Sequence, residues 1–568
     1  MKAAVMTAAE GFLTRLGQHG IKYLFANSGT DFAPLIEAYE NADDYALALW
    51  PKPLTITHET VAVGMAHGAF LVSNQPQAVM VHVNVGLANA IMGLINAQSD
   101  KVPILMFAGR TPITEFHRLG SRMTPIQYGQ EMFDQAGMLR DVVKWDYEIR
   151  YAEQIIDAVD RAVSVATSAP TGPVFLGLPR EPLAEPMVQG RGVDHPLPPR
   201  SCLQLPDNAA LELLAEKIAK AKFPLLICQR GDASGQLGEA VNRLCKIYPI
   251  GVIEPFVITN SLAADHPCHL GYQTKGLLEK ADCLIVVESP VPWIQRFATP
   301  AKDCHIAHIG HDPLFTNMPM RSFPSSQNIN GAAHLALDGL AKLLAKQAGE
   351  PVSGATVKAF KKTRDEGLLA MLDGLPQTGV ITADMVAVAL ADYLDQNTIV
   401  FSELGPAPDL ARPGFANQWF TPPYSGGLGW GIPAALGAKL AAPEKRVIAC
   451  VGDGSYIFAN PVACNQVMAA LSLPVLVIIL NNQSWNATRR AAHNMYPDGA
   501  VSKINNPVLT DLAPSPDFTA IASANGGWTS AVNHSENMAT QIAKAMEIVD
   551  VEKRPATIDL RVAKRDGF

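Results

Sequence analysis

Short runs of almost wholly apolar residues recur along the chain, and segments of helix length separate them. A strand that is apolar at every position has both faces buried, as in a parallel sheet with helices on each side. Eleven such runs are "KYLFANSG", "QAVMVHV", "VPILMFAG", "GPVFLGLP", "FPLLICQRG", "ADCLIVVES", "CHIAHIG", "NTIVFSELG", "KRVIACVGDG", "LPVLVIILNN" and "RPATIDLRV". The pattern predicts an α/β protein made of doubly wound parallel sheets.

The runs fall into three groups along the 568 residues, which are too many for one ordinary domain. Two segments rich in Pro, Gly and polar residues, 194–206 and 346–355, separate the groups and are typical of linkers. We therefore expect three parallel-sheet domains: an N-terminal domain over 1–190, a central domain over 200–345 and a C-terminal domain over 356–568.

Composition excludes several classes of partner. The formal net charge of -8 and the lack of a long basic run argue against nucleic-acid binding. No apolar run reaches the roughly 18 residues of a membrane span, and the first twenty or so residues predict an amphipathic helix instead of a signal peptide. The eight cysteines form no CxxC pair, which favours a reducing, cytoplasmic compartment.

Two runs of the third group end in polar residues suited to a metal and a phosphate. Asp453 follows "RVIACVG", and Asn482 ends "LPVLVIILNN". Ligands of open α/β sheets lie beyond the carboxyl ends of the strands, and Mg²⁺ prefers oxygen ligands. Gly452 and Gly454 allow backbone N–H groups to approach a phosphate, and Ser455 adds a hydroxyl. Taken singly, each segment also fits a plain turn without a ligand.

The order and spacing of Gly-Asp-Gly at 452–454 and Asn-Asn at 481–482 resemble the cofactor motif of thiamin-diphosphate enzymes. The family is the acetolactate synthase, benzoylformate decarboxylase and pyruvate decarboxylase group. The resemblance implies that the chain binds thiamin diphosphate through Mg²⁺, with Asp453, Asn482 and Ser484 as the metal ligands.

Two distant segments strengthen the resemblance. "SGGLGWGIPAALGAKLA" (425–441) is similar to the family's segment around the aminopyrimidine of the cofactor, which implies that the Gly426 carbonyl accepts its amine and that Leu428 supports the bent cofactor. "THETVAVGMAHGAF" (57–70) is similar to the segment that carries the family's activating glutamate, here Glu59. Alone, the first is a Gly-rich loop before a helix, and Glu59 is a charge in a first helical turn. In the family the two halves of the site come from different subunits, which implies a homodimer or homotetramer with shared active sites.

Local similarity to benzoylformate decarboxylase bears on the substrate. "NSGT" (27–30) and "VHVNVGLANAIMG" (81–93) resemble its active-site segments, which implies that Thr30 holds a substrate carboxylate and that His82 moves protons. His82 also ends an apolar run, so a buried core histidine is the alternative. The second active-site histidine of that enzyme has no clear counterpart here, and Trp293 lies in that region of the sequence.

Two features that mark other members of the family are missing from this sequence. "VESPVPWIQRF" (287–297) replaces the turn with which acetolactate synthases bind FAD, so FAD is not expected, and no His-His pair of the pyruvate decarboxylase type occurs.

Residues 483–499 are expected to form a loop and helix at the active-site mouth, where Trp485 packs on an apolar substituent and Arg489, Arg490 or His493 meets an anion. A solvated helix face is the alternative for the arginines.

These observations predict a thiamin-diphosphate-dependent 2-oxo acid decarboxylase, with carboligase activity as a further possibility, that resembles benzoylformate decarboxylase and takes a small-molecule 2-oxo acid or aldehyde as substrate. A carboligase or lyase of the acetolactate synthase or 2-hydroxyacyl-CoA lyase type, without FAD, is the alternative. A nicotinamide-dependent oxidoreductase is disfavoured, because no GxGxxG follows a strand with an acid downstream.

Overall fold

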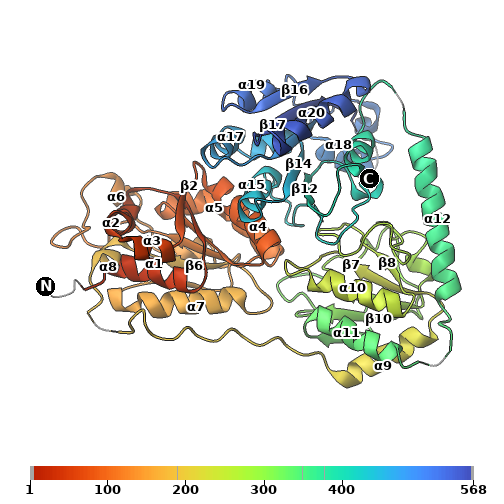
Figure 1. The fold of residues 1–568 in the computed structure, drawn as a ribbon, viewed down its shortest axis with the longest axis horizontal. Coiled ribbons are helices and arrows are strands. Elements are labelled where there is room, and N and C mark those ends of the chain that lie inside the picture. The colour runs from red at the N-terminus through yellow and green to blue at the C-terminus, as the bar shows by residue number, and fades with distance from the viewer. Residues whose placement is uncertain (1–4, 189, 348, 377, 565–568) are drawn as a thin grey trace. The chain divides into compact units, whose positions relative to one another are not determined.

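Three parallel sheets form the framework of the protein (Figure 1). The computed structural model describes residues 5–188, 190–347, 349–376 and 378–564. Neighbouring strands within each sheet pair in parallel. The predicted fold class, α/β with doubly wound parallel sheets, is therefore confirmed.

The first sheet has the strand order β2-β1-β3-β4-β6-β5. Its strands are β1 (Tyr23–Asn27), β2 (Lys52–Thr55), β3 (Gln77–Val81), β4 (Ile104–Ala108), β5 (Asp146–Glu148) and β6 (Val174–Gly177). The accompanying helices are α1 (Ala8–Gln18), η1 (Thr30–Phe32), α2 (Ala33–Asn41), α3 (Asp44–Leu49), α4 (Glu59–Ser73), α5 (Val83–Ser99), α6 (Ile126–Gly129), η2 (Ala136–Met138), η3 (Ala152–Gln154), α7 (Ile155–Thr167) and α8 (Arg180–Ala184). Side chains of α1 and α7 form one core with Leu24, Met80 and Phe107, while the alternate strand residues Val79 and Met106 are also buried, so both faces of the sheet are covered.

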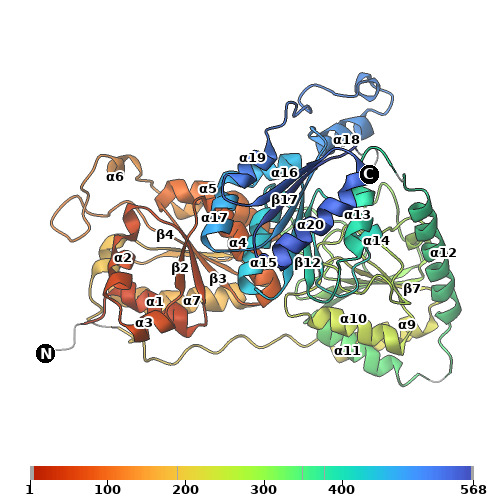
Figure 2. The same cartoon turned by 45° about the horizontal axis from the view of Figure 1, so that its top comes forward.

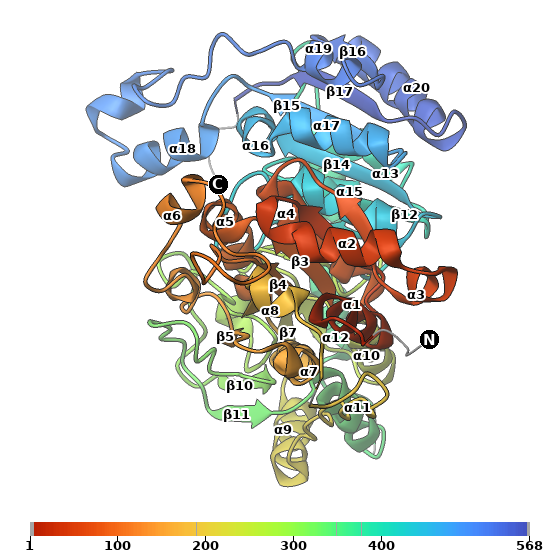
Figure 3. The same cartoon turned by 90° about the vertical axis from the view of Figure 1, so that its left-hand side faces the viewer.

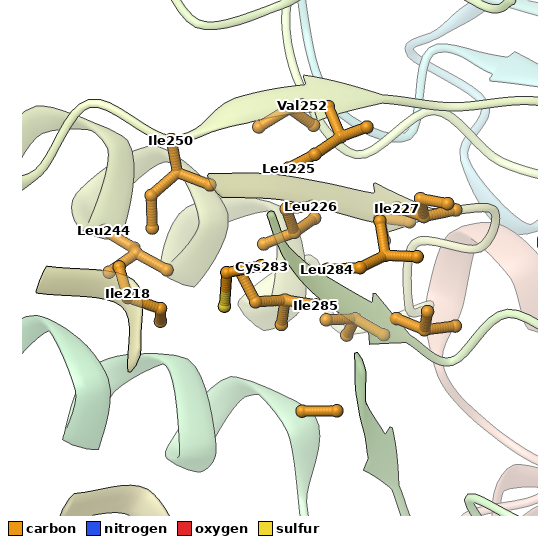
Figure 4. Packing of buried hydrophobic residues seen from close by; sticks show 14 of the residues in the cluster. Ile218, Leu225, Leu226, Ile227, Leu244, Ile250, Val252, Cys283, Leu284 and Ile285 are labelled. Carbon is orange, nitrogen blue, oxygen red and sulfur yellow. The ribbon is translucent and has the colours of Figure 1, made fainter. Parts of the chain in front are cut away.

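The second sheet has the order β11-β10-β9-β7-β8. Its strands are β7 (Pro224–Cys228), β8 (Gly251–Ile253), β9 (Cys283–Val287), β10 (His305–Gly310) and β11 (Gln327–Asn330), with helices α9 (Asn208–Lys220), α10 (Gln236–Ile247), η4 (Leu278–Lys280), α11 (Ala333–Leu344) and α12 (Gly354–Asp373). Figure 4 shows the aliphatic core between strands and helices, in which Leu226, Ile285 and Leu244 are completely buried. Trp293 belongs to the same core and packs edge-on against Phe323 at 5.0 Å between ring centroids.

The third sheet has the order β13-β12-β14-β15-β17-β16. Its strands are β12 (Thr398–Glu403), β13 (Trp419–Phe420), β14 (Arg446–Gly452), β15 (Leu476–Asn481), β16 (Trp528–Val532) and β17 (Ala556–Arg561). The helices in this part of the sequence are α13 (Ala383–Ala391), α14 (Pro408–Ala411), α15 (Gly431–Ala441), α16 (Asp453–Phe458), α17 (Pro461–Ala470), α18 (Asn486–Met495), η5 (Ala500–Lys503), α19 (Phe518–Ser523), η6 (Ser535–Asn537) and α20 (Met538–Asp550). Helix α20 lies along β17 and β16 (Figure 2) and buries Ile542 and Ala545 in the core of this sheet.

The chain forms two compact units. The first comprises Met1–Ser201, Pro422–Pro443 and Ser455–Leu473, and the second comprises Cys202–Thr421, Glu444–Gly454 and Pro474–Phe568. The first unit therefore holds the first sheet with α15 and α17, and the second unit holds the other two sheets. The predicted boundaries of the three domains stay a prediction, and residue 348 of the predicted second linker lies outside the described residues.

Local expectations agree with the structure in most places. The N-terminal segment forms α1, which begins at a capping box between Thr7 and Glu10. Each of the eleven predicted runs contains a strand, whereas β2, β5, β8, β11, β13 and β16 were not predicted. Among the described helices, none combines the length and the apolar character that crossing a membrane requires.

Helices α4 and α15 lie side by side in the first unit (Figure 3) and approach each other through glycines. A Cβ atom added to Gly68 would overlap the carbonyl oxygen of Ala434, and one added to Gly437 would overlap that of Met65. Both helices are apolar around most of their circumference. The helix pair therefore depends on backbone-to-backbone contact that any larger residue disrupts.

We predict that Gly68→Ala lowers the melting temperature, because its methyl group forces a buried backbone shift that typically costs about 1–3 kcal/mol. The matched control is Gly367→Ala in α12, where the added Cβ meets no described atom and where alanine favours the helix by roughly 0.5–1 kcal/mol. Thermal unfolding monitored by circular dichroism distinguishes the two variants. A Gly68→Ala protein as stable as the Gly367→Ala protein would contradict the tight packing of α4 on α15.

Candidate active site

The carboxyl ends of β14 and β15 bring Asp453 and Asn482 to the same edge of the third sheet. Gly452, the last residue of β14, pairs with Leu480 near the end of β15. Asp453 then begins α16, and Asn482 follows β15 directly. The expected location of these two side chains is thus the one that the structure shows, at the edge where α/β proteins bind ligands.

The carboxyl group of Asp453 is buried and only partly satisfied. Its Oδ1 accepts a hydrogen bond from the Gly454 N–H at 3.0 Å, while no described residue donates to Oδ2. Burial raises the pKa of Asp453 to about 6, although backbone N–H groups, among them those of Gly454, Gln483 and Ser484, lower it. Burial therefore disfavours the charged form of Asp453, which a cation at Oδ2 would stabilise.

Two neighbouring oxygens share this property. The Asn482 Oδ1 and the Ser455 Oγ are buried without a hydrogen-bond partner among the described residues. A divalent cation binds carboxylate and amide oxygens, and a hydroxyl group donates to phosphate. These unsatisfied atoms fit a metal-bound diphosphate. The Ser484 hydroxyl differs from these atoms because it already has a partner: it donates to the Thr510 carbonyl at 3.0 Å.

Trp485 and α18 follow this edge. The indole ring of the half-buried Trp485 lies against Gly454, where any side chain would overlap it. Arg489 is 5% exposed, and its Nε donates to Asn486 at 2.9 Å. The alternative of a solvated helix face is therefore wrong for Arg489, which lies on the buried side of α18, whereas Arg490 and His493 are half-buried.

In the first unit, Glu59 is the first residue of α4 and its carboxyl group is buried. The preceding His58 caps the helix by accepting the Thr60 N–H at 3.2 Å. Asn89 of α5 donates to Glu59 Oε2 at 3.2 Å, and Glu59 Oε1 lies beside Gly86 in the first turn of α5. The carboxyl group is thus held by α5 and is not a solvated first-turn charge.

The same helix holds the glycine-rich segment around Gly426. Asn96 donates to the Gly427 carbonyl at 2.9 Å and accepts from the Gly427 N–H at 3.1 Å and the Ser425 hydroxyl at 2.7 Å. Gly426 itself adopts a φ of 70° and is exposed, and Leu428 is half-buried. Residues Asn89 and Asn96 lie two turns apart on one face of α5, so a single helix positions Glu59 and the 425–428 segment. Neither asparagine was predicted from the sequence.

His82 and Thr30 meet at the carboxyl edge of the first sheet. Gly29, which follows β1 closely, packs directly on the ring of His82, the residue after β3. Thr30 is exposed, and its carbonyl accepts a hydrogen bond from Arg180 at 3.3 Å. The His82 side chain is 19% exposed and its Nδ1 lies 2.6 Å from Asp31. Because Gly86 follows His82 by one helical turn, Glu59 and His82 flank the start of α5.

Comparisons with known proteins agree with this geometry. Two family models match the chain: "Thiamine pyrophosphate enzyme, N-terminal TPP binding domain" over residues 6–138 and "Thiamine pyrophosphate enzyme, C-terminal TPP binding domain" over residues 410–560. These ranges contain Thr30, Glu59 and His82 in the first case, and the Gly426 and Asp453 segments in the second. The fold and the site thus define an enzyme that uses thiamin diphosphate, the same compound as thiamine pyrophosphate.

Individual relatives cover almost the whole chain. It is 27% identical to a benzoylformate decarboxylase of Pseudomonas aeruginosa over 524 residues, which are 90% of this chain and 91% of the relative. It is 24% identical to the acetolactate synthase large subunit of Lactococcus lactis, with 98% and 92% covered. The crystal structure of benzoylformate decarboxylase from Polynucleobacter necessarius has the same fold, with a TM-score of 0.78, 21% identity and 99% of both chains covered. The chain belongs to the thiamine pyrophosphate enzyme family.

Proposed function

We propose that the protein is a thiamin-diphosphate- and Mg²⁺-dependent 2-oxo acid decarboxylase. The observation that carries the proposal is the arrangement at the start of α5, where a buried carboxyl group, Glu59, and a partly accessible imidazole, His82, flank the same helix end. The similarity to a benzoylformate decarboxylase over 90% of the chain supports it.

Groups from several segments would hold the cofactor. Asp453, Asn482 and Ser484 would bind the Mg²⁺, and the backbone of Gly452 and Gly454 with the Ser455 hydroxyl would bind the diphosphate. The unsatisfied Oδ2 of Asp453 and Oδ1 of Asn482 support the metal assignment. The Gly426 carbonyl and Leu428 would receive the aminopyrimidine, in a segment that Asn96 holds in place.

When bound, the cofactor supplies a nucleophilic carbon and an electron sink for the departing carboxylate. The chain supplies the proton transfers and the orientation. Glu59 would hold the proton shared with the aminopyrimidine ring, His82 would exchange a proton with the substrate oxygen, and the Thr30 hydroxyl would donate to the substrate carboxylate. Trp485 would present an apolar surface to the substituent of the substrate.

A carboligase or lyase of the acetolactate synthase or 2-hydroxyacyl-CoA lyase type is the second candidate function. The similarity to an acetolactate synthase large subunit over 98% of the chain favours it. FAD is not part of the proposed cofactor set, because residues 287–297 differ from the FAD-binding turn of that family and place Trp293 in the core.

We also propose a cytoplasmic location, which the free state of all eight cysteines supports.

Product analysis tests the proposed function directly. The purified protein with thiamin diphosphate and Mg²⁺ is offered a panel of aromatic and aliphatic 2-oxo acids, and CO₂, aldehydes and hydroxyketones are measured. CO₂ with an equivalent of aldehyde supports the decarboxylase, whereas CO₂ with hydroxyketone supports the carboligase. Release of no CO₂ from any member of the panel, by protein shown to bind the cofactor, would refute the proposal.

We predict that Glu59→Gln retains fold and cofactor binding but loses turnover on the order of 10²- to 10⁴-fold, because an amide does not exchange the required proton. Glu37→Gln, an equal change at an exposed position of α2, is the control and keeps full turnover. Steady-state rates per bound cofactor are compared. Full turnover by Glu59→Gln would show that Glu59 serves only its contacts with α5.

A second prediction concerns the metal. Thiamin diphosphate raises the melting temperature only when Mg²⁺ is present, because its diphosphate and Asp453 otherwise repel each other. Asp453→Ala abolishes this shift, and Asp392→Ala, at an exposed position, retains it. Differential scanning fluorimetry with Mg²⁺ or with a chelator gives the readout. Equal stabilisation under both conditions argues against a metal bridge.

We further propose a homo-oligomer whose active sites are shared between subunits. The resemblance to the family supports this proposal, because there the segment of the activating glutamate and the diphosphate-binding segment come from different subunits. Mixing inactive Glu59→Gln and Asp453→Ala proteins is then expected to restore part of the activity. Tagged subunits provide the control for exchange. If exchange occurs without recovery, each chain builds its own site.

A further inference from the structure

Asp31 is a buried carboxylate beside the predicted proton-transfer residue, and no site predicted from the sequence includes it. It lies in η1, directly after Thr30, and is 2% exposed. Its Oδ1 is 2.6 Å from His82 Nδ1, and its Oδ2 accepts the backbone N–H of Val83 at 3.2 Å. Both carboxylate oxygens therefore bind to the same two-residue stretch at the start of α5.

These contacts determine which nitrogen of His82 carries the proton. An ionised carboxylate accepts hydrogen bonds and donates none, so the neutral imidazole must be protonated on Nδ1. The other nitrogen, Nε2, is then an acceptor. It lies 3.2 Å from the side-chain amide nitrogen of Gln130, which is a donor. The two neighbours of the ring thus require the same tautomer.

The ring has little freedom to turn. Gly29 packs on one side of it, and a Cβ atom at Gly29 would overlap the ring. Asp31 is equally confined, since a Cβ atom at Gly109, after β4, would overlap its carboxylate. Val83 has a φ of 38°, which is strained for a β-branched residue, and the hydrogen bond from its N–H to Asp31 helps to hold that conformation.

Gln130 belongs to a segment that is anchored at several points. The Gln135 amide donates to the Gly109 carbonyl at 2.9 Å, and the Arg180 guanidinium donates to the carbonyls of Gly120 and Ser121 at 2.6 and 2.9 Å. Arg180 also binds the Thr30 carbonyl. The side chain of Gln130 is therefore presented to His82 by a segment fixed on both sides.

We propose that Asp31 is a positioning residue that fixes the orientation and tautomer of His82. The Gln130 amide lies where the substrate oxygen hydrogen-bonds to His82 Nε2 during turnover. Asp31 keeps the Nδ1–H in place, and Nε2 faces the substrate. The catalytic part of this inference rests on the proposed function of His82, whereas the tautomer does not.

The test uses the Asp31→Asn variant, for which the structure predicts a reversal. Val83 N–H always donates, so the amide oxygen turns toward Val83 and the amide nitrogen toward His82 Nδ1. Nδ1 then becomes an acceptor and the proton moves to Nε2. Long-range ¹H–¹⁵N spectra of histidine-labelled protein at alkaline pH distinguish the two tautomers, and His82→Asn identifies the resonances of His82.

We expect the Nδ1–H tautomer in the wild-type protein and in Gln130→Leu, and the Nε2–H tautomer in Asp31→Asn. Turnover by Asp31→Asn falls on the order of 10²-fold or more at unchanged cofactor affinity. The control is Asp43→Asn, the same change at the exposed cap of α3, which alters neither spectrum nor rate.

An Nε2–H tautomer in the wild type, an unchanged tautomer in Asp31→Asn, or a reversed tautomer with unchanged turnover would each overturn the proposal. If Asp31→Asn does not fold, the wild-type and Gln130→Leu spectra still decide the tautomer. A reversal in a protein that decarboxylates no 2-oxo acid would support the role of Asp31 toward the ring while refuting the proposed function.

Discussion

Parallel strands that are covered by helices on both faces have little room for polar side chains along their length. In β3, β4, β9 and β15 every residue is buried, and apart from Gln77 and Asn481 at strand ends these residues are apolar or glycine. Polar chemistry is therefore displaced to the strand ends, where His82 and Asn482 stand one residue beyond their strands. The rest of the site depends on this constraint, because it gathers distant segments at one edge of each sheet.

Helix α5 turns that edge into an ordered arrangement. It starts beside His82, contacts Glu59 through Gly86 and Asn89, and binds the glycine-rich segment through Asn96. A buried hydrogen bond contributes only about 1 kcal/mol net, but an unsatisfied buried group costs roughly 1–3 kcal/mol. The three hydrogen bonds between Asn96 and residues 425–427 thus fix the backbone of this glycine-rich segment relative to α5.

The limits of prediction from the sequence follow the same logic. All eleven predicted strands are interior strands, and all six that were missed lie at sheet edges. The interior strands are apolar over most of their length, which a single sequence reveals. Among the missed strands, β2, β11 and β16 have mixed burial, and β8 and β13 have only three and two residues. Their pairing is set by the neighbouring strand and not by their own pattern. Likewise Asp453 was singled out because it ends an apolar run within a recognisable motif, and His82 because its segment resembles that of a known family. Asn96 and Gln130 belong to no such motif and acquire their partners only through the fold.

Asp31 and Asp453 show why residue type alone does not define a site. Both are aspartates at the carboxyl edge of a parallel sheet, and both are 2% exposed. The two oxygens of Asp31 are used by His82 and Val83, so this carboxylate needs no further ligand and acts on the group that it binds. Asp453 has one oxygen to which no described residue donates, and burial raises its pKa to about 6, so a bound cation would stabilise its charged form. The proposed roles follow this difference: the satisfied carboxylate would orient a side chain, and the unsatisfied one would bind a metal.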